Sequence, residues 1–190
     1  IICTANAVLS DHEKNNGCLL IDFGAGCTSF VLYENGEPIK KNANRLGGDL
    51  VTKDITDLQL PFKIAEILKK KFGNALASTE TPEKIIELSK KTDNGKVSSI
   101  RSGQLAYIIE ARVRETVDVL LNYLLSLNWF NKGIEKRSIV ITGGASKLTN
   151  LDTLISEKTK VSVRIANAGN KIANAKYFPT MQDARYSALC

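Results

Sequence analysis

The chain has 190 residues, of which 43% are hydrophobic and 24% are charged, and its formal net charge is +6. This composition is typical of a folded globular protein and argues against a disordered or fibrous chain. No apolar run reaches the roughly 18 residues of a membrane helix, and no signal peptide is recognisable. Because the basic residues come without interleaved aromatics or a nucleic-acid motif, we expect no nucleic-acid partner.

Cysteine and histidine are too few for several common kinds of site. The four cysteines show no C-x-x-C spacing, and the single histidine, His12, lies in DHEKNNG, which we interpret as a polar turn. We therefore expect no zinc site, disulfide framework or hydrolase triad, and free thiols favour a reducing cytosol. The first residue is not methionine and the final YSALC stops abruptly, so we expect a piece of a longer protein.

The first predicted elements form an antiparallel meander. Apolar runs at 18–21 and 30–33 flank GAGCTS, and Asn35-Gly36 predicts a hairpin turn before a third strand at 38–41. In a Rossmann unit the glycine loop opens a helix and carries a third glycine. Here β-branched and aromatic residues follow the glycines, which favours a strand and makes a dinucleotide site a weak interpretation.

Helices are predicted next. Gly47-Gly48 predicts a turn, a helical pattern begins at Asp49, and Pro61 starts a second helix that ends at Gly73 after a run of lysines. The lysines suit the C-terminal end of a helix dipole. Beyond this helix, the segment 83–100 predicts a hairpin around Asp-Asn-Gly, with a helix over PEKIIELSKK as the alternative.

The second half of the chain returns to alternating helices and strands. A long amphipathic helix is predicted over 104–127, and its apolar stripe is most simply core. A buried strand at 138–142 ends in Gly143-Gly144-Ala145, a helix begins near Asn150, and a further strand spans 161–165. We find no internal repeat.

Three glycine turns adjoin predicted strands: Asp22-Phe23-Gly24-Ala25-Gly26, Leu46-Gly47-Gly48 and Thr142-Gly143-Gly144-Ala145. Glycine lets a backbone approach a phosphate closely, and successive N–H groups in such turns form an anion-binding concavity. An ionised Asp22 would suit Mg²⁺, held through water because this ion keeps several of its waters. Together the turns indicate a phosphate site, although Asp22 and Gly47-Gly48 also have purely structural interpretations.

These motifs carry a resemblance to a known family. IDFGAGCTSFVLY and IVITGGASKL resemble the second phosphate motif and the adenosine motif of the actin, Hsp70 and hexokinase superfamily. With RLGGDLVTKDI, KIAEILKKKFG, ANAVLSDHEKNNG and ARYSAL, the chain resembles the second lobe of the bacterial cell-division family FtsA. The resemblance implies an α/β, actin-like ATPase (ribonuclease H-like) fold. Subdomain IIA, a mixed five-stranded sheet flanked by helices, would comprise 1–47 and 116–190, and a smaller α+β subdomain IIB would be inserted at 48–115.

The resemblance also implies roles for individual residues. Phosphate contacts would come from Gly24, Gly26 and the amides of Cys27 and Thr28, with Mg²⁺ near Asp22. Gly47 and Gly48 would belong to the same cofactor site, and Gly143, Gly144 and Ala145 would lie against adenosine. Glu66 and Lys69, on one helix face, would hydrogen-bond the ribose, although they could form only a solvated pair. The family usually has glycine, threonine and aspartate at Ala25, Cys27 and Ser29, so we expect ATP binding to be better retained than hydrolysis.

The implied function is that of an ATP-binding scaffold linking FtsZ filaments to the cytoplasmic membrane at the division septum. Arg112 and Glu115 match positions that the family uses for the C-terminal tail of FtsZ, and the alternative is a surface ion pair. Self-association and membrane contact would need the full-length protein, which would be cytoplasmic and peripheral. These residues alone are expected to be inactive. Alternative functions are a small-molecule kinase of the superfamily and a pilus-assembly or Hsp70-like module.

Overall fold

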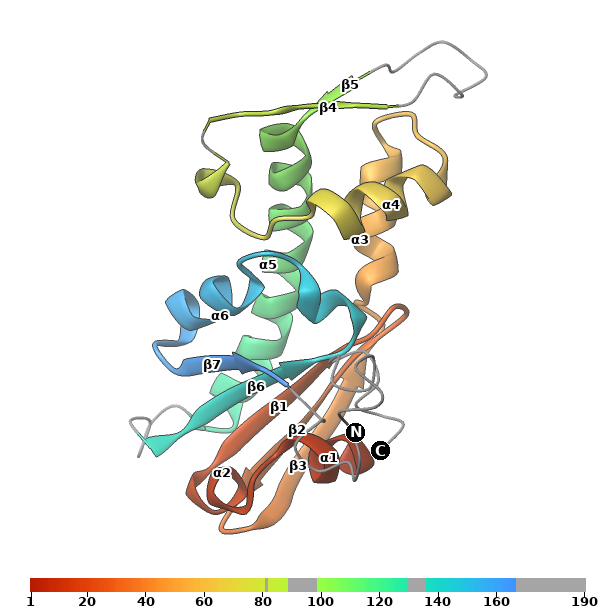
Figure 1. Ribbon diagram of the computed structural model, residues 1–190. Coiled ribbons are helices and arrows are strands. Elements are labelled where there is room, and N and C mark those ends of the chain that lie inside the picture. The colour runs from red at the N-terminus through yellow and green to blue at the C-terminus, as the bar shows by residue number, and fades with distance from the viewer. Residues whose placement is uncertain (81, 89–98, 130–135, 167–190) are drawn as a thin grey trace, which may run out of the picture.

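The computed structural model describes residues 1–80, 82–88, 99–129 and 136–166 and is built around a five-stranded sheet (Figure 1). Its strand order is β3-β2-β1-β6-β7, with antiparallel pairing within β1, β2 and β3 and parallel pairing of β1 with β6 and of β6 with β7. The mixed five-stranded sheet predicted from the sequence is confirmed. The strands are β1 (Cys18–Phe23), β2 (Thr28–Glu34), β3 (Glu37–Asn44), β6 (Ser138–Thr142) and β7 (Ser162–Ile165).

The predicted meander forms because its turn has the required chemistry. Asn35 and Gly36 join β2 to β3 with φ angles of 52° and 84°, the conformation of a tight hairpin that favours this dipeptide. Strand β1 lies in the middle of the sheet and is buried on both sides, which explains its continuous apolar run. Leu19 and Ile21 belong to one core cluster, whereas Cys18 and Leu20 belong to another.

Helices cover the two faces of this sheet. Helix α1 (Ile2–Val8) packs on the face of Cys18 and Leu20. Leucines and isoleucines of α5 (Ser102–Ser126) and α6 (Leu151–Thr159) join the cluster of Leu19 and Ile21 on the other face. Successive residues of a strand point to opposite faces, so β1 supplies both cores.

The prediction of a polar turn at DHEKNNG was wrong, because Asp11–Asn16 form the short helix α2. The Ser10 hydroxyl accepts a hydrogen bond from the Glu13 amide, and the Glu13 carboxylate accepts one from the Ser10 amide. This reciprocal capping satisfies two amides at the start of the helix. The spacing Ser-x-x-Glu was the signal that could have predicted it.

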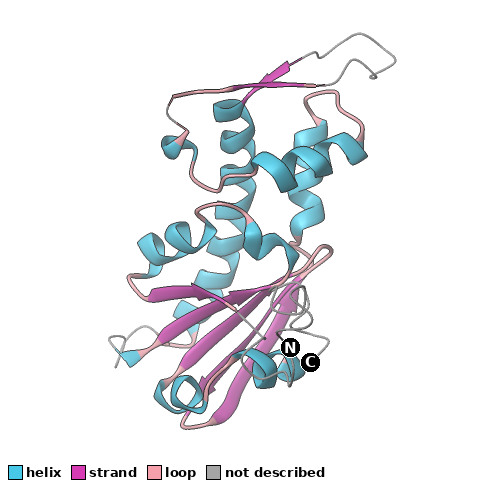
Figure 2. Cartoon of the chain, viewed as in Figure 1, coloured by secondary structure: helices cyan, strands magenta, loops and turns pink. Residues whose placement is uncertain are grey.

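A second group of elements stands beyond one end of the sheet, as Figures 1 and 2 show. Helix α5 runs from this group down to the sheet, and a single hydrophobic cluster continues through both parts. The division of the chain at 47/48 and 115/116 stays a prediction. The group contains α3 (Gly48–Thr56), α4 (Phe62–Phe72), the 3-10 turn η1 (Ala77–Thr79), β4 (Ile85–Glu87), β5 (Ser99–Arg101) and the upper half of α5.

Most other predicted elements agree with the structure. Antiparallel pairing of β4 with β5 confirms the hairpin and not the alternative helix for 85–87, while 89–98 lie outside the described residues. The ARYSAL motif also lies outside them. Gly73 ends α4 as predicted, but at a φ of −67° and not in the left-handed region. Within the described ranges, no helix has both the length and the hydrophobicity of a membrane span.

Candidate functional site

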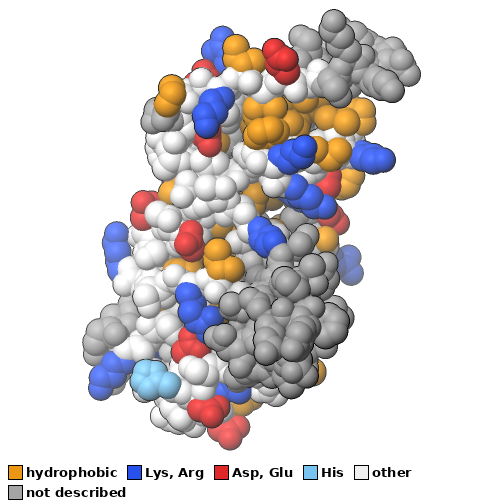
Figure 3. Space-filling view, viewed as in Figure 1, with side chains coloured by type: hydrophobic (Ala, Val, Ile, Leu, Met, Phe, Trp, Pro, Cys, Tyr) orange, Lys and Arg blue, Asp and Glu red, His pale blue; other side chains and the backbone are white. Residues whose placement is uncertain are grey.

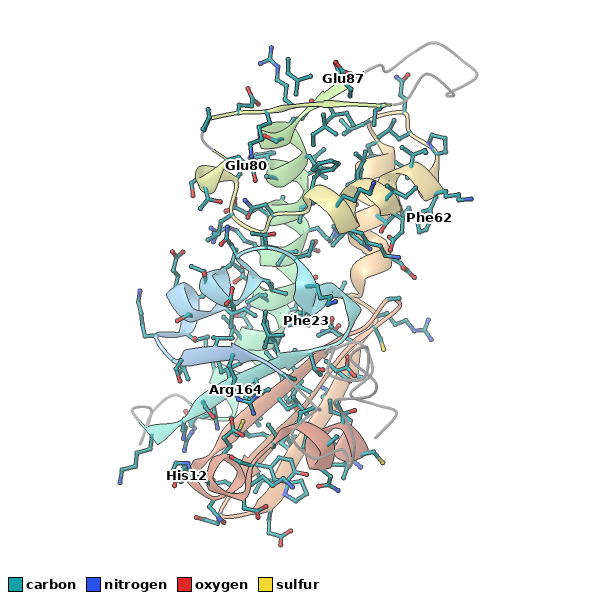
Figure 4. All side chains as sticks on the ribbon, viewed as in Figure 1. His12, Phe23, Phe62, Glu80, Glu87 and Arg164 are labelled. Atoms are coloured by element: carbon teal, nitrogen blue, oxygen red, sulfur yellow. The ribbon has the colours of Figure 1, made fainter. Side chains whose placement is uncertain are left out.

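A pocket of about 360 Å³ lies where the sheet meets the second group of elements. It is bordered by the turns that follow β1 and β6, by the start of α3 and by one face of α4. Figure 4 shows Phe23, the last residue of β1, close to this junction. The carboxyl ends of parallel strands β1 and β6 meet here, as at ligand sites of open α/β sheets. The lining residues are Gly24, Ala25, Gly48, Asp49, Glu66, Lys69, Lys70, Gly144, Ala145, Lys147 and Leu148.

The first glycine turn, residues 24–27, closes the hairpin between β1 and β2. The Gly24 amide donates to the Cys27 carbonyl at 3.0 Å, and α3 starts directly against the turn. The amide of Gly48 donates to the Gly24 carbonyl at 2.9 Å, and the amide of Asp49 donates to the Ala25 carbonyl at 2.8 Å. The first two amides of α3 therefore hold the turn in place.

Gly47 is required by this contact. A Cβ atom at Gly47 would lie 2.2 Å from the Ala25 carbonyl oxygen and 2.5 Å from the Cys27 amide nitrogen. Any side chain would push α3 and the first glycine turn apart. Gly47 thus lets α3 pack against the turn, and it does not line the pocket.

The second glycine turn, residues 143–145, follows β6. Gly143 has a φ of +87°, and a Cβ atom there would lie 2.4 Å from Asp22 Oδ1 and 2.5 Å from the Phe23 carbonyl oxygen. The Ser146 hydroxyl donates to the Gly143 carbonyl at 2.7 Å and closes the turn. Glycine is thus needed at 143 both for its backbone conformation and for the close approach of β1. Gly144 and Ala145 line the pocket.

Asp22 lies beside Gly143 and is not part of the pocket lining. Partial burial raises the pKa of its carboxyl. A desolvated carboxylate is stabilised by a nearby cation, so Asp22 fits the predicted Mg²⁺ through water. Among the described residues no cluster of three or more potential metal ligands exists, so phosphate oxygens and water would have to complete the coordination.

Glu66 and Lys69 project from α4 and line the pocket together. The Lys69 ammonium contacts Glu66 Oε2 at 2.7 Å, and the Thr52 hydroxyl donates to the same oxygen at 2.5 Å. Lys70 lies 3.1 Å from Glu66 Oε1. Burial alone would raise the pKa of Glu66, but hydrogen bonds from Lys69, Thr52 and Lys70 outweigh it and lower the pKa to about 2. Glu66 is therefore an ionised acceptor at the pocket wall at neutral pH.

The structure brings half of the predicted cofactor residues together. Gly24, Gly48, Glu66, Lys69, Gly144 and Ala145 all line the pocket. The others adjoin it without lining it, and the thiol of Cys27, in the first glycine turn, is exposed. Thr28 begins β2, is buried, and uses its hydroxyl to donate to the Leu46 carbonyl at 2.6 Å. The Thr28 side chain therefore has a structural role beside the turn, and the predicted phosphate contact concerns its backbone amide alone.

Five of the lining residues were not predicted to contact the cofactor: Ala25, Asp49, Lys70, Lys147 and Leu148. Ala25, Asp49 and Lys70 are direct neighbours of predicted residues, so adjacency was an available signal. Leu148 gave no such signal. Its Cδ2 atom would be 2.5 Å from a Cβ at Gly73, so the end of α4 packs closely on this wall.

Arg112 and Glu115, predicted to bind a partner, lie on α5 outside the pocket lining. The Arg112 guanidinium donates to both carboxylate oxygens of Asp54 on α3, at 2.5 and 3.0 Å, and also to Glu115. The hydrogen bond to Asp54 raises the pKa of Arg112. The i,i+3 pair is thus present, and Arg112 in addition ties α5 to α3, a partner that the sequence did not reveal.

Solved structures share this fold at low sequence identity. MreB5 of Spiroplasma citri bound to AMPPNP superposes with a TM-score of 0.70 at 18% identity, over 86% of this chain and 52% of that one. The PilM–PilN type IV pilus biogenesis complex gives 0.68 at 22% identity, over 98% of this chain and 47% of that one. These likenesses show that the fold is actin-like, as predicted.

Sequence comparison is more specific. The cell division protein FtsA of Neisseria meningitidis is 34% identical over 151 residues, 79% of this chain and 36% of the relative. That of Bacillus subtilis is 31% identical over 169 residues, 87% of this chain and 37% of the relative. The chain spans a little over a third of the length of these relatives. The family description "Cell division protein FtsA" matches residues 19–188, so the chain belongs to the FtsA family of cell division proteins.

Proposed function

We propose that residues 1–190 form the second nucleotide-binding lobe of an actin-like, ATP-binding cell division protein, with subdomain IIA at 1–47 and 116–190 and subdomain IIB at 48–115. The observation that carries this proposal is the pocket, where two glycine turns meet an ionised Glu66. Structures of MreB5 bound to AMPPNP and to ADP, and of MamK bound to AMPPNP, share the fold. A pocket of about 360 Å³ lies within the usual range of small-ligand sites.

In this proposal each part of the nucleotide contacts a different part of the pocket. The first glycine turn, with Gly24, Gly26 and the amides of Cys27 and Thr28, faces the β- and γ-phosphates. The second glycine turn lies against adenosine, and the Glu66 carboxylate accepts from ribose hydroxyls. Mg²⁺ bound near Asp22 would neutralise phosphate charge. Because Cys27 lacks the hydroxyl of the family's threonine and Ser29 lacks the carboxylate of the family's aspartate, binding is retained better than hydrolysis.

The test is binding of Mg-ATP to the full-length protein, measured by calorimetry. Gly144→Val places a branched side chain in the pocket, where a Cβ meets no protein atom within 4 Å. We expect this variant to fold normally and to lose at least about tenfold in affinity, since the cost falls on the ligand. Thr153→Val, an exposed position on α6, is the control. Unchanged affinity in Gly144→Val, or no binding by the wild type, would refute the assignment.

We further propose that the IIB part binds the C-terminal tail of FtsZ, so that the full-length protein, self-associated and held in the cytoplasm at the inner membrane face by segments other than these, links FtsZ filaments to the septum. Hydrophobic side chains and Lys or Arg side chains gather together on this part of the molecule (Figure 3). Exposed apolar residues here include Phe62, Ile67, Ile85 and Tyr107. An extended peptide with apolar and acidic residues complements such a surface.

The role of Arg112 in this contact can be separated from its ion pair with Asp54. Arg112→Gln removes the charge offered to a peptide carboxylate, whereas Asp54→Asn weakens the same internal pair and leaves the guanidinium in place. With a fluorescently labelled FtsZ tail peptide, we expect weaker binding by Arg112→Gln and equal or tighter binding by Asp54→Asn. An equal loss in both variants would assign Arg112 a structural role only.

A further inference from the structure

The inner face of α4 carries a charged group where a helix normally presents apolar side chains. The Lys69 side chain is only 9% exposed, and its ammonium reaches three acceptors. These are the Gly48 carbonyl at 2.9 Å, Thr52 Oγ1 at 2.7 Å and Glu66 Oε2 at 2.7 Å. A lysine ammonium has three hydrogens, so this side chain has none left for a ligand.

Thr52 completes the arrangement from α3. Its side chain is fully buried, accepts from Lys69 and donates its single hydrogen to Glu66 Oε2, which at 2.5 Å is closer than the Gly48 carbonyl at 3.2 Å. Glu66 Oε2 is thus engaged by two internal donors. Among the described residues, the partner of Glu66 Oε1 is Lys70, whose side chain is 68% exposed and can move away.

The same contacts extend to the first glycine turn through Gly48. The carbonyl of Gly48 accepts from Lys69, and its amide donates to the Gly24 carbonyl at 2.9 Å. A buried charge that lost its partners would be costly, so the three acceptors stay in place around the ammonium. The position of the first glycine turn therefore depends on a lysine in another helix.

We propose that Thr52 and Lys69 are positioning residues of the nucleotide site, an inference that rests on the proposed function. They fix the Gly48 backbone and one oxygen of Glu66, and they leave Glu66 Oε1 as the group of this cluster that accepts from the ribose. This replaces the expectation that Lys69 itself contacts the ribose. It also gives a role to Thr52, which lies outside the pocket lining.

The first measurement uses the full-length protein without nucleotide. The amides of Gly48 and Asp49 donate to carbonyls of the first glycine turn, and both substitutions weaken the cluster that holds the start of α3 in place. We therefore expect amide hydrogen exchange at Gly48 and Asp49 to accelerate by about tenfold or more in Lys69→Met and in Thr52→Val. Thr52→Ser keeps the hydroxyl and should exchange as the wild type does. Lys63→Met removes the same charge from an exposed site on α4 and is the matched control. Unchanged exchange in Lys69→Met and Thr52→Val would overturn the inference.

The second measurement compares Mg-ATP with Mg-2′,3′-dideoxy-ATP, which keeps the phosphates and the base but lacks the ribose hydroxyls. Positioning residues should weaken both ligands, each by about tenfold, in Lys69→Met and in Thr52→Val, whereas Glu66→Gln should weaken ATP more than the dideoxy compound. If Lys69→Met weakens ATP alone, Lys69 contacts the ribose and the inference is wrong. If the wild type binds neither nucleotide while the exchange results hold, the proposed function fails and the positioning role is confined to the fold.

Discussion

The turn that follows β1 and the turn that follows β6 both line the pocket, but they are held in place in different ways. The first glycine turn is supported from a distance, since amides of α3 hold its carbonyls and α4 in turn holds α3. The second is supported locally, by the contact of Gly143 with the end of β1 and by the hydroxyl of Ser146, the residue that follows the turn. One turn therefore depends on helix packing, and the other on strand pairing.

The glycines in and beside the two turns also differ in why glycine is needed at each position. Gly143 combines a positive φ with a close contact, and Gly47 has an ordinary φ of −106° and a close contact alone. At Gly26 and Gly144, by contrast, a Cβ atom would meet nothing within 4 Å. A glycine required by the fold can thus be separated from one whose position leaves room for a ligand.

The largest expected effect is at the second glycine turn. Gly143→Ala imposes a strained φ and an overlap with the Phe23 carbonyl, so we expect a loss of about 3 kcal/mol in the free energy of unfolding. Gly144→Ala, with open space and no positive φ, should change it by less than about 0.5 kcal/mol. Urea unfolding of both variants measures this difference. Similar losses in the two variants would show that the positive φ and the close contact with β1 do not make Gly143 more important for stability than Gly144.

A smaller effect is expected at the first glycine turn. Gly47→Ala has no conformational strain, and α3 can move, so we expect a loss of about 2 kcal/mol. Because the overlap is with Ala25 and Cys27, amide NMR shifts should change at residues 24–27 and remain unchanged at 143–145. Gly26→Ala is the control with open space. Changes of equal size in both turns would mean that the two are not supported independently.

The sequence was sufficient for the parts of the fold that local chemistry decides. The turn dipeptide Asn35-Gly36 predicted the hairpin, and Pro61 predicted the start of α4. The continuous apolar run of β1 predicted a buried strand. The order of glycine turns likewise indicated the pocket. Ser10 and Glu13 show that a local signal was available and was missed, since their capping box starts α2.

The partners of polar groups could not be predicted in the same way. Nothing in the sequence shows that Lys69 is buried against Gly48 and Thr52, or that Arg112 reaches Asp54, 58 residues away. Such contacts depend on how α3 packs between α4 and α5, which is a tertiary property. The same holds for Gly47, whose role depends on the path of α3 past the first glycine turn.

The smallest expected effects are pH-dependent and have opposite signs at the two turns. Glu66, which supports the first, has a pKa lowered from 4.5 to about 2 by its hydrogen bonds despite burial. Its ionised form therefore stabilises the fold above pH 4.5, and this contribution is lost as the pH falls toward 2. Asp22, beside the second, has a pKa raised by burial, so its ionisation costs stability as the pH rises.

Two neutral substitutions separate these contributions. Glu66→Gln should lower the free energy of unfolding by about 1 kcal/mol at pH 7, because the charge-assisted hydrogen bonds are lost, and the difference from wild type should shrink below pH 4.5. Asp22→Asn should raise it slightly at pH 7, by less than about 1 kcal/mol, since a desolvated charge is removed. Urea unfolding at pH 7, 5 and 4 measures both, with Glu157→Gln on the exposed face of α6 as the control. A difference for Glu66→Gln that stays constant with pH would show that its carboxylate is not what stabilises the support of the first glycine turn.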